Sequence, residues 1–130
     1  MVELNTSLGN GALMDKLGIE WIETSPERVV ARIPVEGNTQ PVGFLHGGAS
    51  ACLAETIASV GSWLNDTTKL TFGIEIKVNH LKSVREGFIT GVGLPLQLGR
   101  NVQVWEIRMT DDQERLVAFS TCTIAIKDAN

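Results

Sequence analysis

The sequence is poor in the residues from which metal centres and disulfide frameworks are built. Its 130 residues include two cysteines, two histidines and no tyrosine. Cys52 and Cys122 stand far apart in apolar surroundings, which is typical of buried free thiols in a reducing cytosol. Because no Cys or His residues cluster at ligand spacing, we expect no metal and no redox cofactor.

The chain also lacks the features that mark nucleic-acid-binding, membrane and secreted proteins. Its net charge is −4 and it has no block of basic residues, so nucleic acid has no electrostatic footprint. No apolar run is long enough to cross a bilayer, and the first residues lack the basic region and apolar core of a secretory signal. We therefore expect a cytoplasmic protein with neither a nucleic-acid nor a membrane partner.

Hydrophobic periodicity predicts a single α+β domain over residues 1–130. Before the centre of the chain we expect a short helix carrying Leu13, Met14 and Leu17, capped by Asn5 or Thr6, and strands at residues 19–24 and 28–35. After residue 66 the pattern alternates. This alternation places Phe72, Ile74, Ile76 and Val78 on one strand face. It continues in a second strand through Phe88, Thr90, Val92 and Leu94. The last two strands are predicted at residues 102–110 and 116–126. Short loops make these strands antiparallel.

A helix is expected at residues 47–64, with small and apolar residues around most of its circumference. Such a helix is typically buried, and a chain of this length has little to cover it, so we expect a dimer or a homotetramer built from dimers. Its polar residues form a narrow row of Glu55, Ser59 and Ser62. The row is either a solvated edge or the lining of a cleft, where Glu55 would be a partly buried acid with a chemical role.

The segment His46-Gly47-Gly48 stands where this helix begins. Its glycines leave the first backbone N–H groups of the helix, which lack intrahelical partners, open to a ligand. The helix dipole adds positive potential, which suits a developing oxyanion. The simpler interpretation is a loop histidine followed by two turn glycines. A buried helix with an acid two turns in favours the functional interpretation.

Residues 38–59, NTQPVGFLHGGASACLAETIAS, resemble the signature of the hotdog-fold acyl-CoA thioesterases, closest to the 4-hydroxybenzoyl-CoA thioesterase type with a glutamate on the central helix. The stretches GIEIKVNHLKSVREG, PLQLGRNVQVWEI and TCTIAI look like the bacterial branch that includes 1,4-dihydroxy-2-naphthoyl-CoA thioesterases of menaquinone synthesis. In the related phenylacetate-pathway type the helix acid is usually aspartate, so Glu55 favours the first group. The resemblance implies a hotdog fold, a long helix wrapped by a curved antiparallel sheet, and paired subunits with active sites at their interface.

The resemblance also implies roles for particular residues. Glu55 would be the nucleophile or general base, and Gly47, next to His46, would donate its N–H to the thioester oxyanion. Gln40 would position substrate or water, and Ser59 would orient the attacking water. The residues implied to contact CoA or the acyl group are Gly73, His80, Lys82, Ser83, Arg85, Leu98, Gly99, Arg100 and Asn101.

Thioester hydrolysis needs only a few catalytic groups, such as one carboxylate and one oxyanion donor. A thiolate leaves readily, so one carboxylate can attack the carbonyl directly or deprotonate water. Three alternatives make other demands on the sequence. A Ser-His-Asp hydrolase would need a G-x-S-x-G elbow, and a hotdog dehydratase would need its proline-containing motif, and both motifs are absent. A non-catalytic acyl-CoA-binding protein would not need Glu55. The acyl group, aromatic or medium-chain, stays open, because Phe44, Trp63, Phe72 and Leu94 suit an aromatic pocket and a core equally.

Overall fold

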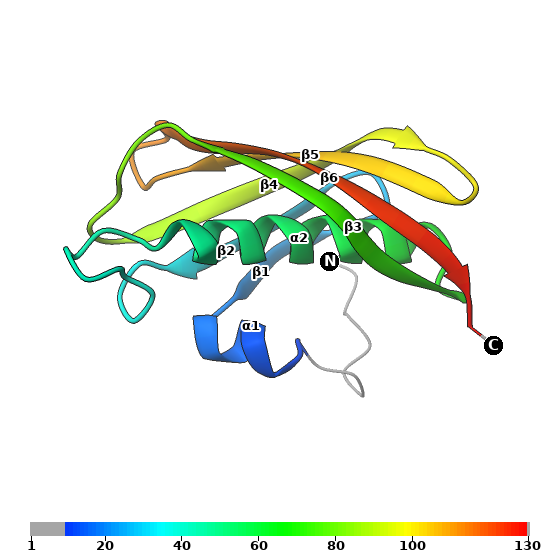
Figure 1. Cartoon of the computed structure of the whole chain (residues 1–130), viewed down its shortest axis with the longest axis horizontal. Coiled ribbons are helices and arrows are strands. Elements are labelled where there is room, and N and C mark those ends of the chain that lie inside the picture. The colour runs from blue at the N-terminus through cyan, green and yellow to red at the C-terminus, as the bar shows by residue number, and fades with distance from the viewer. Residues whose placement is uncertain (1–9, 130) are drawn as a thin grey trace.

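The structure is a computed structural model that describes residues 10–129. Within these residues the chain forms α1 (Ala12–Leu17), β1 (Glu20–Thr24), β2 (Val29–Pro34), α2 (Gly47–Asn65), β3 (Lys69–His80), β4 (Phe88–Leu98), β5 (Val102–Thr110) and β6 (Leu116–Asp128). The six strands make one curved sheet, α2 runs along its concave side, and α1 lies beyond α2 (Figure 1). The predicted α+β architecture is confirmed. In the described part of the chain, no helix is long and apolar enough to span a membrane.

The two helices lie close to their predicted positions. α2 begins at the predicted residue, Gly47, and extends one residue past the predicted end. α1 carries the three predicted apolar residues and buries Met14, but the residue that precedes it is Gly11. The predicted caps, Asn5 and Thr6, lie outside the residues described.

The sheet runs in the order β1-β2-β4-β5-β6-β3, and all neighbouring strands are antiparallel. β3 is therefore an edge strand. It pairs with β6 on one side and has no neighbour on the other among residues 10–129. An open edge presents backbone N–H and C=O groups that a strand of another molecule can use.

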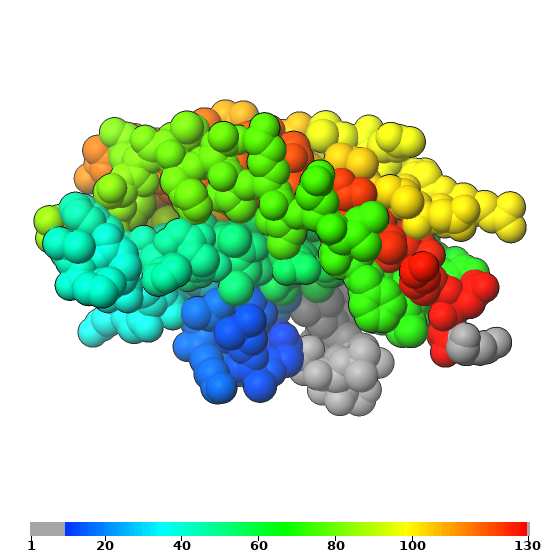
Figure 2. All heavy atoms as spheres, viewed as in Figure 1, coloured from blue at the N-terminus to red at the C-terminus, as the bar shows by residue number. Residues whose placement is uncertain are grey.

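The core lies between α2 and the sheet, where Leu53 and Ile57 pack in one apolar cluster with Trp105 and Ile107 of β5. The opposite flank of α2 reaches the surface between β3 and α1 (Figure 2). Along that helix Cys52 and Val60 are only partly buried. The sheet thus packs along α2 and leaves the flank between β3 and α1 only partly buried within a single chain.

β3 corrects one prediction, because its apolar residues do not share a face. Its pairing with β6 shifts register just after Gly73, so that a β-bulge reverses the alternation. Ile76 and Val78 pack against the core, whereas Phe72 and Ile74 are 52% and 61% exposed. The bulge therefore leaves apolar side chains on the surface of an edge strand and turns Gly73 toward α2.

β4 alternates as predicted, but the predicted side chains, from Phe88 to Leu94 at every second position, lie on the side of the sheet that faces away from α2. The face turned to α2 consists of small and apolar residues: Ile89, Gly91 and Gly93. The two glycines leave room for the side chain of Ile57 on α2. The predicted set of Phe88, Thr90, Val92 and Leu94 is accordingly half-buried or exposed.

Candidate active site

The start of α2 holds an open backbone donor. His46 is the N-cap, and its Nδ1 accepts a hydrogen bond of 2.8 Å from the N–H of Gly48. The N–H of Ala49 donates to the carbonyl of His46 at 3.0 Å. The N–H of Gly47 makes no hydrogen bond with any residue from 10 to 129. His46 thus satisfies one of the first N–H groups and leaves the neighbouring one available, at the positive end of the helix dipole.

Close packing explains the glycine at this position. The imidazole of His80, the last residue of β3, lies so near that a β-carbon on Gly47 would be 3.0 Å from its Nε2 and Cε1. Gln40, Gly47, His80, Lys82 and Ser83, all predicted from the sequence, line one cavity of about 390 Å³, which we call the proximal cavity. The structure therefore brings these five residues together at the N-terminal end of α2.

Gln40 reaches the proximal cavity from a tight loop. Its backbone N–H donates to the carbonyl of Phe44 at 2.8 Å, and its carbonyl accepts from the N–H of Gly43 at 2.9 Å. Its side-chain Oε1 accepts from the N–H of Val42. Within the described residues the side-chain NH₂ group makes no hydrogen bond, so it is a donor fixed in place and free to bind a substrate oxygen or a water.

Glu55 lies two turns further along α2 and is partly buried. Its carboxylate lies over Gly73 of β3, where a β-carbon would be only 2.3 Å from Oε2. Neither carboxylate oxygen makes a hydrogen bond or an ion pair within residues 10–129. Gly73 therefore makes room for a carboxylate that is available as a base or nucleophile.

Two thiols lie within electrostatic reach of Glu55, and both stay protonated. Burial raises the pKa of the Cys52 thiol, and the negative charge of Glu55 raises it further. Burial also raises the pKa of Cys122, opposed by a hydrogen bond with Ser120 and reinforced by Glu55. Since the thiolate is the reactive form, neither cysteine is suited to act as a nucleophile here. The carboxylate of Glu55 is therefore the candidate for the reactive group.

The polar row of α2 lies against the sheet and is not a solvated edge. Ser59 is partly buried, and its carbonyl accepts a hydrogen bond of 3.1 Å from the Thr71 hydroxyl on β3. Ser62 is buried, with 2% of its surface exposed. Of the two interpretations left open by periodicity, the structure supports the row as the lining of the space between α2 and β3.

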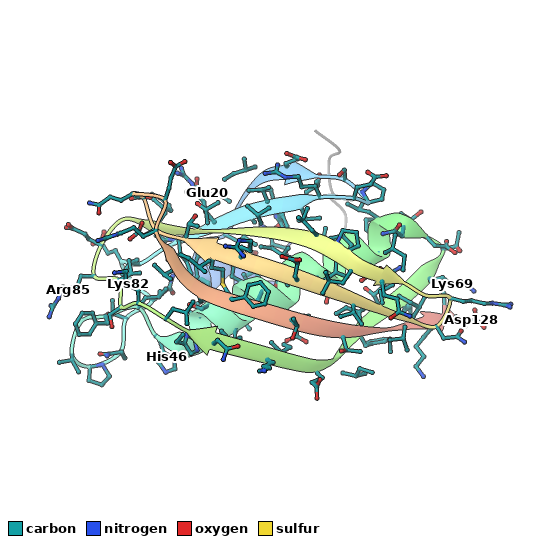
Figure 3. The ribbon with its side chains drawn as sticks, turned by 90° about the horizontal axis from the view of Figure 1, so that it is seen from above. Glu20, His46, Lys69, Lys82, Arg85 and Asp128 are labelled. Atoms are coloured by element: carbon teal, nitrogen blue, oxygen red, sulfur yellow. The ribbon has the colours of Figure 1, made fainter. Side chains whose placement is uncertain are left out.

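Apart from Gly73, which lies beside Glu55, the residues expected to contact CoA fall into two groups at opposite ends of α2. One group lies at the N-terminal end of α2, where His46, Lys82 and Arg85 gather in Figure 3. The other, Leu98 to Asn101, lines a second cavity of about 870 Å³ with Lys69 and Asp128 at the opposite end (Figure 3). α2 has 19 residues and so spans roughly 28 Å between the two groups.

Sequence reasoning missed Ser50 in the proximal cavity and the contact between Arg85 and Phe44. Ser50 is 4% exposed and lines the cavity one turn beyond Gly47. The guanidinium of Arg85 stacks on the ring of Phe44, with 4.2 Å from its carbon to the ring centre. The position of Ser50, one turn after Gly47, could have indicated that it lines the cavity. The stacking of Arg85 on Phe44 could not be predicted, because the two residues are 41 apart in sequence.

Comparison with known proteins gives the class of the molecule. Residues 42–118 match the family model of the thioesterase superfamily. The chain therefore belongs to the thioesterase superfamily. Its fold is the hotdog fold, and it is a thioester hydrolase of the acyl-CoA thioesterase type.

Particular relatives cover nearly the whole chain. The Bacillus subtilis protein ComA2, a candidate esterase, is 48% identical over 117 residues, which are 88% of this chain and 93% of ComA2. The 1,4-dihydroxy-2-naphthoyl-CoA hydrolase of Escherichia coli is 40% identical over 127 residues, 96% of this chain and 93% of that enzyme. A Staphylococcus aureus thioesterase, solved with a glutamine-to-alanine substitution, has a TM-score of 0.85 at 32% identity, covering 90% of this chain and 99% of that one. A second structure of the S. aureus protein carries a glutamate-to-alanine substitution.

Proposed function

We propose that the protein hydrolyses an aromatic or medium-chain acyl-CoA thioester to the free acid and CoA. Glu55 is the nucleophile or the general base, and the N–H of Gly47 stabilises the oxyanion. The observation that carries the proposal is the N–H of Gly47, at a helix N-terminus and without a hydrogen bond among residues 10–129. It lies in a cavity that also holds the side-chain NH₂ of Gln40, which likewise has no partner among those residues. Two of the relatives, at 40% identity, are hydrolases of an aromatic acyl-CoA, which favours an aromatic acyl group.

The S. aureus structures support the choice of residues. The glutamine and the glutamate substituted in them are as far apart along that chain as Gln40 and Glu55 are along this one. In this mechanism Gln40 positions the thioester or the attacking water, and Ser59, one turn after Glu55, orients that water. Lys82 and Arg85 supply positive charge for the CoA phosphates.

The geometry of α2 supports a site in which the two main groups come from different subunits. Gly47 and Glu55 are eight residues apart on one helix, so they lie roughly 12 Å apart along its axis. A nucleophile and an oxyanion donor must each lie about 3 Å from the same carbonyl group. A Glu55 side chain cannot cover that gap, and it also leans toward β3. We propose that the N–H of Gly47 meets the partner subunit's Glu55 on one thioester.

A dimer would also reunite the two groups of CoA residues and cover the exposed parts of β3. The open edge of β3 carries Phe72 and Ile74 on its surface, and the flank of α2 beside it is only partly covered. Burial of such surfaces stabilises a permanent interface. We expect sedimentation at micromolar concentration to show a dimer or a tetramer. A compact monomer would overturn both the assembly and the shared site.

Hydrolysis is tested with thiol release from benzoyl-CoA and octanoyl-CoA. We expect turnover of at least one of them, with the Glu55→Gln variant as the inactive control. Hydration of crotonyl-CoA with no thiol release would instead indicate a dehydratase. Saturable binding without either reaction would indicate an acyl-CoA-binding protein. The free thiols of Cys52 and Cys122 agree with the proposed cytoplasmic location.

A further inference from the structure

The proximal cavity holds a buried hydroxyl group that has no role in the proposed mechanism. Ser50 lies on α2 one turn after Gly47, at the end of the helix where His46 and Lys82 are found (Figure 3). The residue is 4% exposed and lines the cavity, yet its hydroxyl makes no hydrogen bond with any residue from 10 to 129. Serines inside helices commonly donate to the carbonyl four residues earlier, and Ser50 does not. A buried hydroxyl without a partner is unfavourable, and a ligand in the cavity can supply the missing acceptor.

Ser50 and Gly47 direct their donors to the same part of the proximal cavity. Residues three apart share a face of a helix, and these two are separated by about 4.5 Å along the axis of α2. Because helix side chains lean toward the N-terminus, the hydroxyl of Ser50 leans toward the turn that holds Gly47. In a capping box, a longer side chain at the same offset reaches back to a backbone N–H. Serine is too short to close that contact, so one ligand oxygen can accept from both donors.

The surroundings of Ser50 favour a negative charge on that oxygen. Val84, Val117 and Ala118 line the same cavity and are at most 8% exposed. Water therefore screens the site little, and a hydrogen bond to a developing charge is strong there. Among the described residues that line the cavity none is acidic and Lys82 is basic, and the N-terminal end of α2 adds positive potential.

We propose that Ser50 is a catalytic residue that donates a second hydrogen bond to the thioester oxygen, beside the N–H of Gly47. The inference rests on the proposed function, because it takes the thioester carbonyl to lie at Gly47. As the partner subunit's Glu55, or a water that it activates, bonds to the carbonyl carbon, an electron pair of the C=O bond moves onto the oxygen held by Gly47 and Ser50. When the C=O bond re-forms, the C–S bond breaks and the CoA thiolate leaves. Ser50 keeps its proton throughout.

The test measures turnover of benzoyl-CoA and octanoyl-CoA by Ser50→Ala. We expect kcat to fall by about 10²-fold, the lower end of the range for one lost oxyanion donor, with little change in KM, because the oxyanion forms only as the reaction proceeds. Binding of S-octyl-CoA, a thioether without the carbonyl oxygen, should be unchanged. Ser120→Ala is the matched control, because Ser120 is also buried but bonds to Cys122 and does not line the proximal cavity. It should keep the wild-type kcat.

A thermal melt separates this role from a structural one. Because the hydroxyl of Ser50 has no partner within the described residues, Ser50→Ala should melt at the wild-type temperature or above it. Near-normal kcat in Ser50→Ala, a matching loss of S-octyl-CoA binding, or a clear fall in Tm of that variant would each overturn the assignment of Ser50. A wild-type protein that hydrolyses neither thioester would instead remove the proposed function and this inference with it.

Discussion

Glu55→Gln should lose thioesterase activity by about 10²–10⁴-fold while the fold stays intact. Glutamine keeps the size of the side chain but cannot attack a carbonyl or take a proton from water. The carboxylate has no hydrogen bond or ion pair within the described residues, so its loss leaves no partner unsatisfied. The measurement is kcat/KM on the best CoA thioester, together with a thermal melt.

Glu27→Gln is the matched control for that variant. It removes the same charge from an exposed position between β1 and β2 and should change kcat/KM little. If Glu55→Gln kept near-normal turnover, Glu55 would not be the catalytic group. The row of polar residues on α2 would then have a structural role only.

Gly47→Pro should lower turnover by about 10²–10³-fold, the usual effect of losing one oxyanion donor. Proline has no N–H, and Gly47 is the first residue of α2, where proline is tolerated. The backbone of His46 is extended, with ψ of 130°, which is the conformation preferred before a proline. The fold should therefore survive the substitution, and the loss should appear in kcat.

Gly47→Ala separates the lost donor from simple crowding. Both variants add a β-carbon near the imidazole of His80, but alanine keeps the N–H. The alanine variant should retain more activity than the proline variant. Equal activity of the two would assign the loss to contact with His80, and unchanged turnover of folded Gly47→Pro would show that another group holds the oxyanion.

Much of the fold could be predicted from the sequence, because periodicity and helix start signals are local. The order of elements and the first residue of α2 follow from such signals. The β-bulge of β3 does not. In the sequence, Phe72, Ile74, Ile76 and Val78 form an unbroken alternation of apolar residues, and the register shift is determined by the pairing with β6. The incomplete cover of α2, by contrast, was anticipated, because a chain of 130 residues has little with which to cover a long apolar helix.

The candidate site was partly predictable for the same reason. Gly47 and Glu55 stand out because a glycine at a helix start and an acid in an apolar helix have local meaning. No local signal shows that Lys82 and Arg85 lie far from Arg100, because distance along the chain does not tell which end of the sheet a turn occupies. Ser62 was visible only as the last member of a polar row. Its burial, and the lack of a hydrogen bond to its hydroxyl among the described residues, required the structure.

The central claim is that Gly47 and Glu55 act on one thioester from two subunits. It is tested most directly by mixing Glu55→Gln and Gly47→Pro proteins, dissociating them and allowing them to re-associate. In a hybrid dimer one site would receive the intact Gly47 of one chain and the partner subunit's intact Glu55, while the other site would carry both substitutions. We expect an equal mixture of the two inactive proteins to recover about a quarter of the wild-type rate. No recovery in verified hybrid dimers would contradict the shared site.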